Sequence, residues 1–315
     1  MSTWPVAPVL LDGAMGTELE RRGARMDAPL WSAHALIEAP ALVREIHRDY
    51  LRAGAQVITT NTFRTHARNL AAGGLADRAA ELTTLAVRLA REAREAVAAY
   101  DPAAASARIA GAISPLEDCF RPADSPGSRA GPEHRSMAET LTAAGCDLLL
   151  VETMGRVDEA VAAVAACQGL GPPIWLAVVC RADGRMLAGE RLTELVAGLR
   201  GLAVQALLIN CTELGFLGAA IPALVEAAAG SDLLLGTYPH TGRQEGSRFV
   251  THAVAAESFA AEVAGWTRRA PLAIVGSCCG STPDWTAALA RALYDAPGAA
   301  SETRARLEAW VARRV

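Results

Sequence analysis

Eight short apolar runs recur along the 315-residue chain, and each ends in small or polar residues. Near-continuous apolar runs are typical of strands buried on both faces of a parallel sheet. Helical patterns separate them; the pattern over 41–54 repeats Leu42, Ile46 and Leu51 on one face and ends at a glycine. The predicted strands are 8–16, 56–63, 107–114, 146–153, 173–180, 204–213, 232–240 and 272–280.

Eight strand–helix units in a chain of this length predict a closed (β/α)8 barrel of the α/β class, the TIM barrel. We expect one barrel domain over 1–315 with a helical C-terminal tail over 301–315. A doubly wound open sheet is the alternative. The first turn, DGAMG (12–16), lacks the G-x-G-x-x-G pattern of a dinucleotide loop, which weakens that alternative. The loop-like stretch 121–134 is expected over the barrel mouth.

Charge and hydropathy argue against several classes of partner. The formal net charge of −4 gives no indication of nucleic acid or of an acidic membrane surface. No apolar run reaches the ~20 residues that span a bilayer. The first residues lack the basic segment and cleavage site of a signal peptide, so a cytoplasmic protein is expected. The absence of lysine excludes Schiff-base catalysis, lysine-held pyridoxal phosphate and a Walker A loop.

Three cysteines fall at predicted C-terminal strand ends, where barrels carry their active sites. Cys211 ends the sixth strand, and Cys278 and Cys279 end the eighth, so one strand separates them in a closed barrel. Three thiolates with an open fourth position describe a catalytic zinc site. Adjacent strand residues point to opposite faces, so both can ligate only where the strand has broken, as Gly276 and Gly280 would allow.

Two other interpretations of these cysteines stay open at this point. They can be unrelated buried thiols, or Cys278 and Cys279 can form a redox pair. The odd total of seven cysteines argues against a disulfide framework. If the three hold zinc, their soft donor set favours a fourth sulfur ligand, and a substrate thiol bound there would lose its proton. The chemistry indicated is then alkyl transfer to sulfur.

Five motifs are informative together: LLDGAMGTELERRG (10–23), PLWSAHALIEAPALVREIHRDYLRAGAQVITTNTF (29–63), DLLLVET (147–153), INC (209–211) and GSCCG (276–280). By these motifs the chain resembles the homocysteine S-methyltransferase family over nearly its whole length. The resemblance implies that Zn2+ is held by Cys211, Cys278 and Cys279 and that homocysteine sulfur takes the fourth position. It also implies methyl transfer from S-methylmethionine or S-adenosylmethionine to give methionine.

The same resemblance assigns two acidic residues. Asp12 and Glu152 match the carboxylates that hold the amino group of homocysteine. An ammonium group in a closing pocket requires such a partner. From the residues alone, Asp12 can equally be a turn residue and Glu152 part of an ion pair in the barrel core.

Four further residues match the walls of the family's pocket. Thr60, Asn61 and Phe63 match a segment that lines it, and Trp31 matches a tryptophan on the donor side. An aromatic face attracts an onium methyl donor by cation–π interaction. Ordinary packing is the alternative role for each of these side chains.

The sequence departs from the family pattern around the expected donor side. Ser277 replaces a glycine, His240 stands where many relatives have asparagine, and Arg64 stands where betaine-type enzymes have tyrosine. The stretch ISPLEDCFRP (113–122) replaces a G-P-Y-G-like segment. The donor therefore stays open.

Several alternatives follow from that open donor. A separate corrinoid protein or betaine can supply the methyl group, and the acceptor can be selenocysteine or another small thiol. From a different class, the chain can be a non-catalytic zinc or thiol sensor that switches by oxidation of Cys278 and Cys279. The presence of both Asp12 and Glu152 argues against a sensor, which has no use for an amino-acid pocket. The sequence gives no prediction of oligomeric state.

Overall fold

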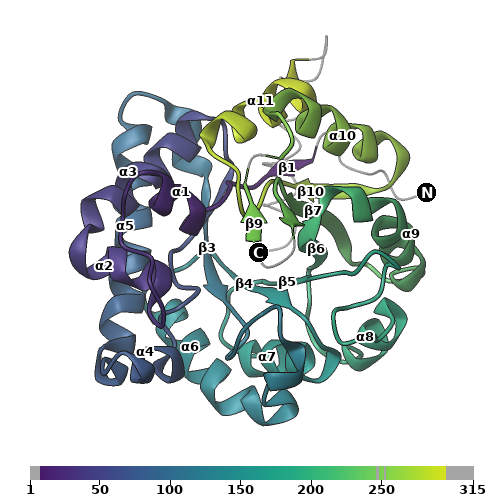
Figure 1. Ribbon diagram of the computed structural model, residues 1–315, viewed down its shortest axis with the longest axis horizontal. Helices are drawn as coiled ribbons and strands as arrows, with labels where there is room; N and C mark the ends of the chain where they lie inside the picture. The colour runs from purple at the N-terminus through teal and green to yellow at the C-terminus, as the bar shows by residue number, and fades with distance from the viewer. Residues whose placement is uncertain (1–7, 246–247, 252, 296–315) are drawn as a thin grey trace.

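The computed structural model describes residues 8–245, 248–251 and 253–295, and it shows a barrel of parallel strands inside a ring of helices (Figure 1). The eight barrel strands pair in the order β1-β10-β7-β6-β5-β4-β3-β2. A parallel bridge from Leu11 to Val57 joins β1 to β2 and closes the circle. The predicted (β/α)8 barrel is confirmed, and the doubly wound alternative is wrong.

The barrel strands are β1 (Val9–Leu10), β2 (Val57–Thr59), β3 (Arg108–Ile113), β4 (Leu148–Met154), β5 (Ile174–Val178), β6 (Ala206–Glu213), β7 (Leu234–His240) and β10 (Leu272–Val275). A hairpin of β8 (Arg243–Glu245) and β9 (Arg248–Val250) follows β7. The helices are α1 (Gly16–Arg21), α2 (His34–Glu38), α3 (Pro40–Arg52), α4 (Ala67–Ala72), α5 (Ala79–Ala98), α6 (Gly131–Ala143), α7 (Val157–Cys167), α8 (Leu192–Gly198), α9 (Leu217–Ala227), α10 (Ala256–Arg269) and α11 (Pro283–Tyr294). Within these described ranges, each helix is too short or too polar to cross a membrane.

The apolar residues divide into two layers. One cluster packs alternate strand residues against each other inside the barrel, among them Leu148 and Leu150 of β4 and Trp175 of β5. The larger cluster lies between the strands and the helices. Because strand side chains alternate, Glu152 continues the inward face of Leu148 and Leu150 at the upper end of β4. The filled interior closes the barrel below, so a site is available only at the carboxyl ends of the strands.

Three strands are much shorter than predicted. The run 56–63 was expected as a strand, but β2 spans only Val57–Thr59. The runs 8–16 and 272–280 were expected as strands, but β1 ends at Leu10 and β10 ends at Val275. Beyond them the chain turns over the barrel end, where the hydroxyl of Ser281 accepts from the Ala14 N–H at 3.1 Å. These residues bond to one another across the barrel mouth instead of continuing the sheet. The helix α11 begins after Thr282, whose side chain caps it by accepting from the Asp284 N–H. The predicted tail over 301–315 lies outside the described residues.

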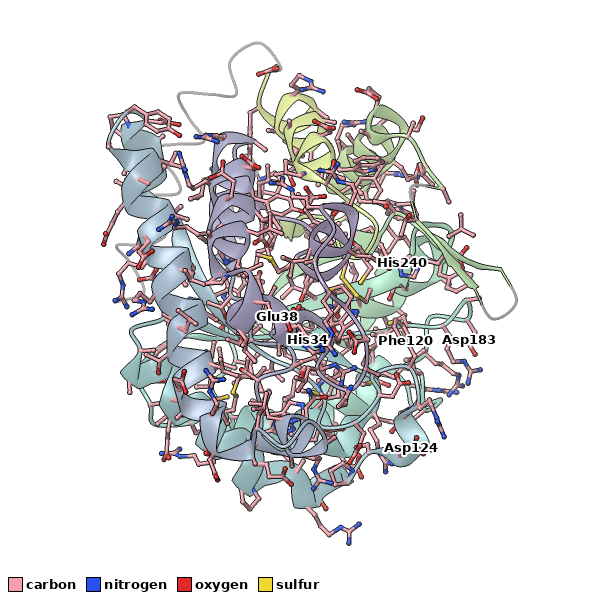
Figure 2. All side chains as sticks on the ribbon, turned by 60° about the vertical axis from the view of Figure 1, so that its left-hand side comes forward. His34, Glu38, Phe120, Asp124, Asp183 and His240 are labelled. Carbon is pink, nitrogen blue, oxygen red and sulfur yellow. A yellow bond between two sulfur atoms is a disulfide. The ribbon has the colours of Figure 1, made fainter. Side chains whose placement is uncertain are left out.

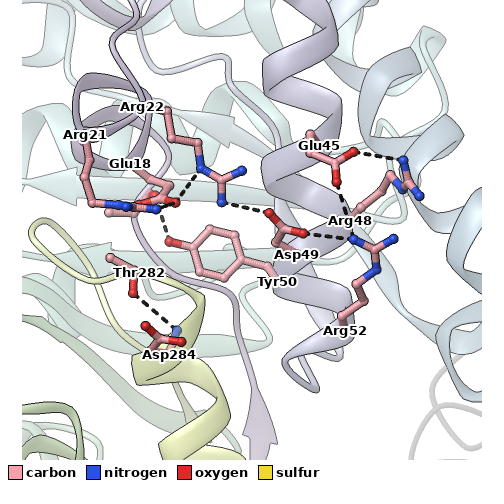
Figure 3. Close-up of polar contacts among 11 residues, drawn as sticks. Glu18, Arg21, Arg22, Glu45, Arg48, Asp49, Tyr50, Arg52, Thr282 and Asp284 are labelled. Carbon is pink, nitrogen blue, oxygen red and sulfur yellow. Dashed lines mark hydrogen bonds and ion pairs between the residues drawn. The ribbon is translucent and has the colours of Figure 1, made fainter.

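A buried charge cluster fixes the turn that follows β1 (Figure 3). The fully buried carboxylate of Glu18 on α1 accepts from Arg22 at 2.7 Å, and Arg22 also pairs with Asp49 on α3 at 2.8 Å. The Tyr50 hydroxyl donates to the Ala14 carbonyl at 2.8 Å. A buried carboxylate is stable only with such partners, so α1 is held on α3 and the 12–15 turn is held in place.

Candidate metal centre and active site

The structure brings the three predicted cysteine ligands together. Their Sγ atoms lie within 4.8 Å of one another, from the end of β6 and from the loop after β10. Cys211 Sγ is 3.7 Å from Cys279 Sγ. Figure 2 draws sulfur in yellow and labels His240 at the end of β7, the strand between the two that carry the cysteines. As the strand order predicted, one strand separates the two ligand positions.

The backbone at the adjacent cysteines is irregular, as the sequence required. A Cβ on Gly276 would lie 2.8 Å from Leu11 Cβ, so only glycine allows this close approach. Gly280 has a φ of +82°, which an L side chain rarely adopts. The Cys278 N–H then donates to the Pro239 carbonyl at 2.9 Å, and the Cys279 carbonyl accepts from Thr241 N–H at 3.0 Å. The loop is thus pinned against the end of β7.

The donor set fits a zinc ion once it is reduced. Tetrahedral zinc with bonds of about 2.3 Å places its sulfur ligands about 3.8 Å apart, which the Cys211–Cys279 distance matches. Cys211 and Cys278 are joined as a disulfide in the structure, and Cys279 is a free thiol. The redox pair considered from the sequence was Cys278 with Cys279, whereas the disulfide in the structure joins Cys211 and Cys278. Thiolates, not a disulfide, bind metal, so zinc binding requires reduction. Among the described residues, these three cysteines are the only group of three or more His, Cys, Asp or Glu side chains that could hold a metal ion.

A cavity of ≈ 510 Å³ lies above the sulfur atoms. Its walls come from the strand ends and from the loops after β1, β2 and β3. All nine residues predicted for the site line this cavity: Asp12, Trp31, Thr60, Asn61, Phe63, Glu152, Cys211, Cys278 and Cys279.

Two buried carboxylates face this cavity without a cationic partner among the described residues. Asp12 accepts from the Thr59 N–H at 2.7 Å and from the Thr59 hydroxyl at 3.0 Å, and Glu152 accepts from the Tyr238 hydroxyl at 3.1 Å. Burial raises the pKa of Asp12 to about 8 despite the bonds from Thr59. Burial likewise raises the pKa of Glu152 to about 7. Both carboxylates are therefore suited to a ligand that brings its own positive charge.

The predicted wall residues divide into two kinds. Trp31 and Phe63 present aromatic rings, packed edge to face with centroids 6.1 Å apart. Asn61 donates to the Ser32 carbonyl at 3.0 Å, and the Thr60 hydroxyl accepts from the Ala112 N–H at 3.2 Å. The side chains of Thr60 and Asn61 were expected to line the substrate pocket. In the structure, their polar groups form hydrogen bonds to the backbone around the cavity.

Backbone strain is concentrated around the cavity. Trp31, Thr153 and Cys211 have φ values of +45°, +62° and +43°, and they are the non-glycine residues with positive φ in the described ranges. All three line the cavity. Each such residue costs of order 1–3 kcal/mol, and the surrounding contacts must hold it in place. Asn210 does so for Thr153, since its Oδ1 accepts from Thr153 N–H at 3.1 Å and its amide donates to Thr153 Oγ1 at 2.8 Å.

The sequence analysis missed some of the residues that shape the site. Tyr238 was not assigned to the site, although its hydroxyl donates a hydrogen bond to Glu152. Thr59 was not singled out, although it supplies both bonds to Asp12. Phe120 was also missed; it lines the cavity from the loop after β3, together with Asp118 of the stretch 113–122 that the sequence analysis placed near the donor side. The polar strand ends T-T-N-T-F and T-Y-P-H were the available signal that these residues lie near the site. Which of them contact one another across the barrel depends on the strand register.

Comparison with known proteins gives one consistent result. A model of the family described as homocysteine S-methyltransferase matches residues 9–293. The chain is 35% identical to the homocysteine S-methyltransferase of Escherichia coli, over 89% of this chain and 94% of that protein. It is 29% identical to a selenocysteine methyltransferase of Astragalus bisulcatus, over 87% and 89% of the two chains. The crystal structure of the E. coli homocysteine methyltransferase MmuM in its metallated form superimposes with a TM-score of 0.77, at 33% identity over 90% and 95% of the two chains.

Proposed function

The chain belongs to the homocysteine S-methyltransferase family, and we propose that it methylates homocysteine on a zinc ion, with S-methylmethionine or S-adenosylmethionine as the donor. The proposal takes the whole chain as one homocysteine-binding barrel domain. It also takes the protein to act in the reducing cytoplasm, which would keep the three cysteines as thiols. Small molecules are its proposed substrates, without nucleic acid or membrane.

One observation carries the proposal: three cysteine sulfurs and two unpaired carboxylates share a single cavity. Cys211, Cys278 and Cys279 would hold the zinc, leaving the fourth position open to the cavity. When bound, zinc would acidify a substrate thiol at that position so that it is a thiolate at neutral pH. The other groups of the site then have to place an amino acid and a methyl donor.

The two carboxylates select an amino acid that carries a thiol. Asp12 and Glu152 would bind the α-ammonium group of homocysteine, whose charge offsets the cost of burying both acids. Thr59 and Tyr238 hold these carboxylates in position by the hydrogen bonds described above. This fixes the amino end of the acceptor and leaves its sulfur free to reach the cysteines.

The aromatic wall suits a positively charged methyl donor. Trp31 and Phe63 offer ring faces and edges to the cavity, and a sulfonium beside them would gain cation–π attraction. In an in-line displacement the acceptor thiolate forms the new S–CH3 bond. The donor's C–S bond breaks at the same time, and its electron pair goes to the leaving sulfur, which becomes a neutral thioether. The barrel contributes by positioning both reactants.

The decisive experiment tests metal and reaction together. The protein would be purified under reducing conditions, its zinc measured, and methionine formation followed from homocysteine with S-methylmethionine, S-adenosylmethionine or betaine. We expect bound zinc and methionine from a sulfonium donor. Both should be lost in Cys211→Ala and kept in Cys180→Ala, a buried cysteine near a strand end that does not line the cavity.

Different results would separate the parts of the proposal. A folded, reduced protein that binds no zinc would refute the metal site. Zinc without methionine from either sulfonium would refute the donor, and addition of betaine or a methylated corrinoid protein would then identify the true one. Faster turnover of selenocysteine than of homocysteine would favour the second acceptor, which the A. bisulcatus relative motivates.

A further inference from the structure

We propose that Arg64 binds the carboxylate of the methyl donor and thereby restricts the donors to molecules with an amino-acid head. The inference rests on the proposed function and deepens it.

Arg64 is held by an aromatic ring at the cavity wall. It follows β2, is half-buried and lines the cavity. Its guanidinium carbon is 5.4 Å from the centre of the Phe63 ring, and Phe63 in turn packs edge to face on Trp31. A guanidinium placed over a ring keeps the N–H groups of its own plane available, and these match the two oxygens of a carboxylate.

No carboxylate of the described residues forms an ion pair with Arg64, although its surroundings contain several. Arg68, four positions later, pairs with Glu117 at 2.9 Å and with Glu133 at 2.5 Å. Arg21, Arg22, Arg78 and Arg94 are each paired in the same way. Arg64 therefore presents a positive charge to the cavity that an anionic group of a ligand can neutralise.

The strand order places Arg64 across from one of the three sulfur ligands, Cys211. In the circle of eight strands, β2 lies four places from β6 in either direction, so Arg64 and Cys211 belong to opposite sides of the barrel. An in-line displacement puts the leaving sulfur on the far side of the methyl group from the nucleophile. Arg64, on the side of the barrel opposite Cys211, would therefore meet the donor, while Asp12 and Glu152 would be occupied by the acceptor.

Asp118 provides the opposite charge at the same end of the cavity. It lines the cavity from the loop after β3, next to β2 in the sheet, and is exposed to solvent. Both charges are near the Cys119 thiol. Burial raises the pKa of this thiol to about 12, the positive charge of Arg64 opposes that rise, and the negative charge of Asp118 adds to it. A guanidinium and a carboxylate at one end of a cavity match the carboxylate and ammonium of an α-amino acid.

Arg64 also discriminates between methyl donors by repulsion. A sulfonium donor without a carboxylate would bring only positive charge to Arg64, whereas S-methylmethionine and S-adenosylmethionine both carry an amino-acid head. Specificity of this kind comes from the unfavourable contact as much as from the favourable one. Arg64 would be a specificity-determining residue, because it contacts the donor and no reacting atom.

The test is binding of S-methylmethionine and of its carboxamide, which differ only at the carboxylate. Each would be titrated by calorimetry into the reduced, zinc-loaded protein whose acceptor site is saturated with 2-aminobutyrate, an amino acid without a thiol. We expect the amide to bind roughly 10- to 100-fold more weakly than S-methylmethionine, the range for a lost charge-assisted hydrogen bond. Arg64→Gln should weaken the binding of S-methylmethionine by a similar factor and make the two compounds bind equally. Arg64→Lys should keep part of it, and the exposed Arg88→Gln should change nothing.

Each outcome bears on one proposal. Equal binding of the two compounds to the unaltered protein would overturn the role of Arg64. A rise in the Kd of 2-aminobutyrate in Arg64→Gln, with donor binding unchanged, would overturn it by assigning Arg64 to the acceptor. Discrimination that depends on Arg64, in a protein that makes no methionine, would support Arg64 and count against the proposed function instead.

Discussion

Asp12 is the residue for which fold and function make opposite demands. Its carboxylate is buried and has hydrogen bonds but no cation among the described groups, and burial raises its pKa to about 8. An arrangement of this kind contributes little to folding, because a buried acid without a counter-charge is costly. Its role then lies in a ligand that supplies the charge.

Asp12→Asn should therefore weaken the binding of homocysteine without lowering the stability of the fold. We expect the KM for homocysteine to rise roughly 10- to 100-fold, as for a lost charged hydrogen bond, with the KM for the donor within about twofold. The urea midpoint should stay the same or rise, since the amide needs no counter-charge. Steady-state kinetics and urea titration measure this, with the exposed Asp77→Asn as the matched control. An unchanged KM for homocysteine would remove Asp12 from the acceptor site.

At this scale the sequence predicts the residues that project from strand ends but not their partners. The three cysteines were predicted because they end apolar runs, and Asp12 and Glu152 were predicted from the family resemblance. The structure places all five at one cavity. The bonds from Tyr238 to Glu152 and from Asn210 to Thr153 join strands distant in sequence. They depend on the register and tilt of the barrel, which no local pattern contains.

At the scale of the elements, one carboxylate on α7 anchors the loop that carries Asp118. Glu159 accepts from the Leu116 N–H at 2.9 Å and from His134 Nε2 at 3.3 Å, and it also accepts from the Ser125 hydroxyl. These groups come from both ends of the segment between β3 and α6. The stretch 121–134 was expected to lie over the barrel mouth, but the residues of this segment that line the cavity are Asp118, Cys119 and Phe120, which come just before that stretch.

This anchor predicts a pH dependence of stability. Burial raises the pKa of Glu159, but the bonds from His134, Ser125 and Leu116 outweigh it, so the pKa lies below the ordinary 4.5. The stabilisation is therefore complete above about pH 4.5 and is lost as the pH falls through the lower, folded-state pKa. Glu159→Gln should reduce the free energy of unfolding by about 1–3 kcal/mol at pH 7, and the difference should shrink towards zero in strong acid.

Urea titrations between pH 7 and pH 3 would measure that difference. Glu139→Gln is the matched control, because Glu139 is exposed and pairs only with Arg135 in the described contacts. Its effect should stay within about 0.5 kcal/mol at each pH. A Glu159→Gln deficit that persists undiminished in acid would show that packing, and not the charge, is what Glu159 contributes.

The sequence predicted the long elements better than the short ones. The helices α3, α5 and α10 have 13, 20 and 14 residues, enough for an apolar stripe to repeat. The missed helices α1, α2 and α4 have 6, 5 and 6 residues, too few for a periodic signal. Strands β1 and β10 were overextended because apolar residues continue past their ends, where they cover the barrel mouth.

For the whole molecule, the barrel and the metal centre should be separable. Cys278 packs against the edge of the inner apolar layer, and Cys211 and Cys279 belong to neither layer, so we expect the fold to form without a metal. Removing zinc with a chelator under reducing conditions should abolish methionine formation and leave the far-ultraviolet circular dichroism unchanged. The loss of bound ligand should lower stability by about 4 kcal/mol or less, the value for metal at 1,000 times its Kd.

Restoring zinc should restore activity, and magnesium should not, because thiolates prefer soft or borderline ions. Thermal unfolding with and without chelator, followed by readdition of each metal, measures both effects. Collapse of the helical signal on chelation would show that the centre is part of the folding core.

The order of the strands has an evolutionary consequence. The sulfur ligands all come from residues 211–279, whereas Trp31, Phe63, Arg64 and Asp118 all come from the first 120 residues. A single recombination event in the gene, within the short connection between α6 and β4, would exchange one group without the other. Ancestral lineages could thus have changed the methyl source by acquiring a new first half, while inheriting the sulfur chemistry of the second half intact.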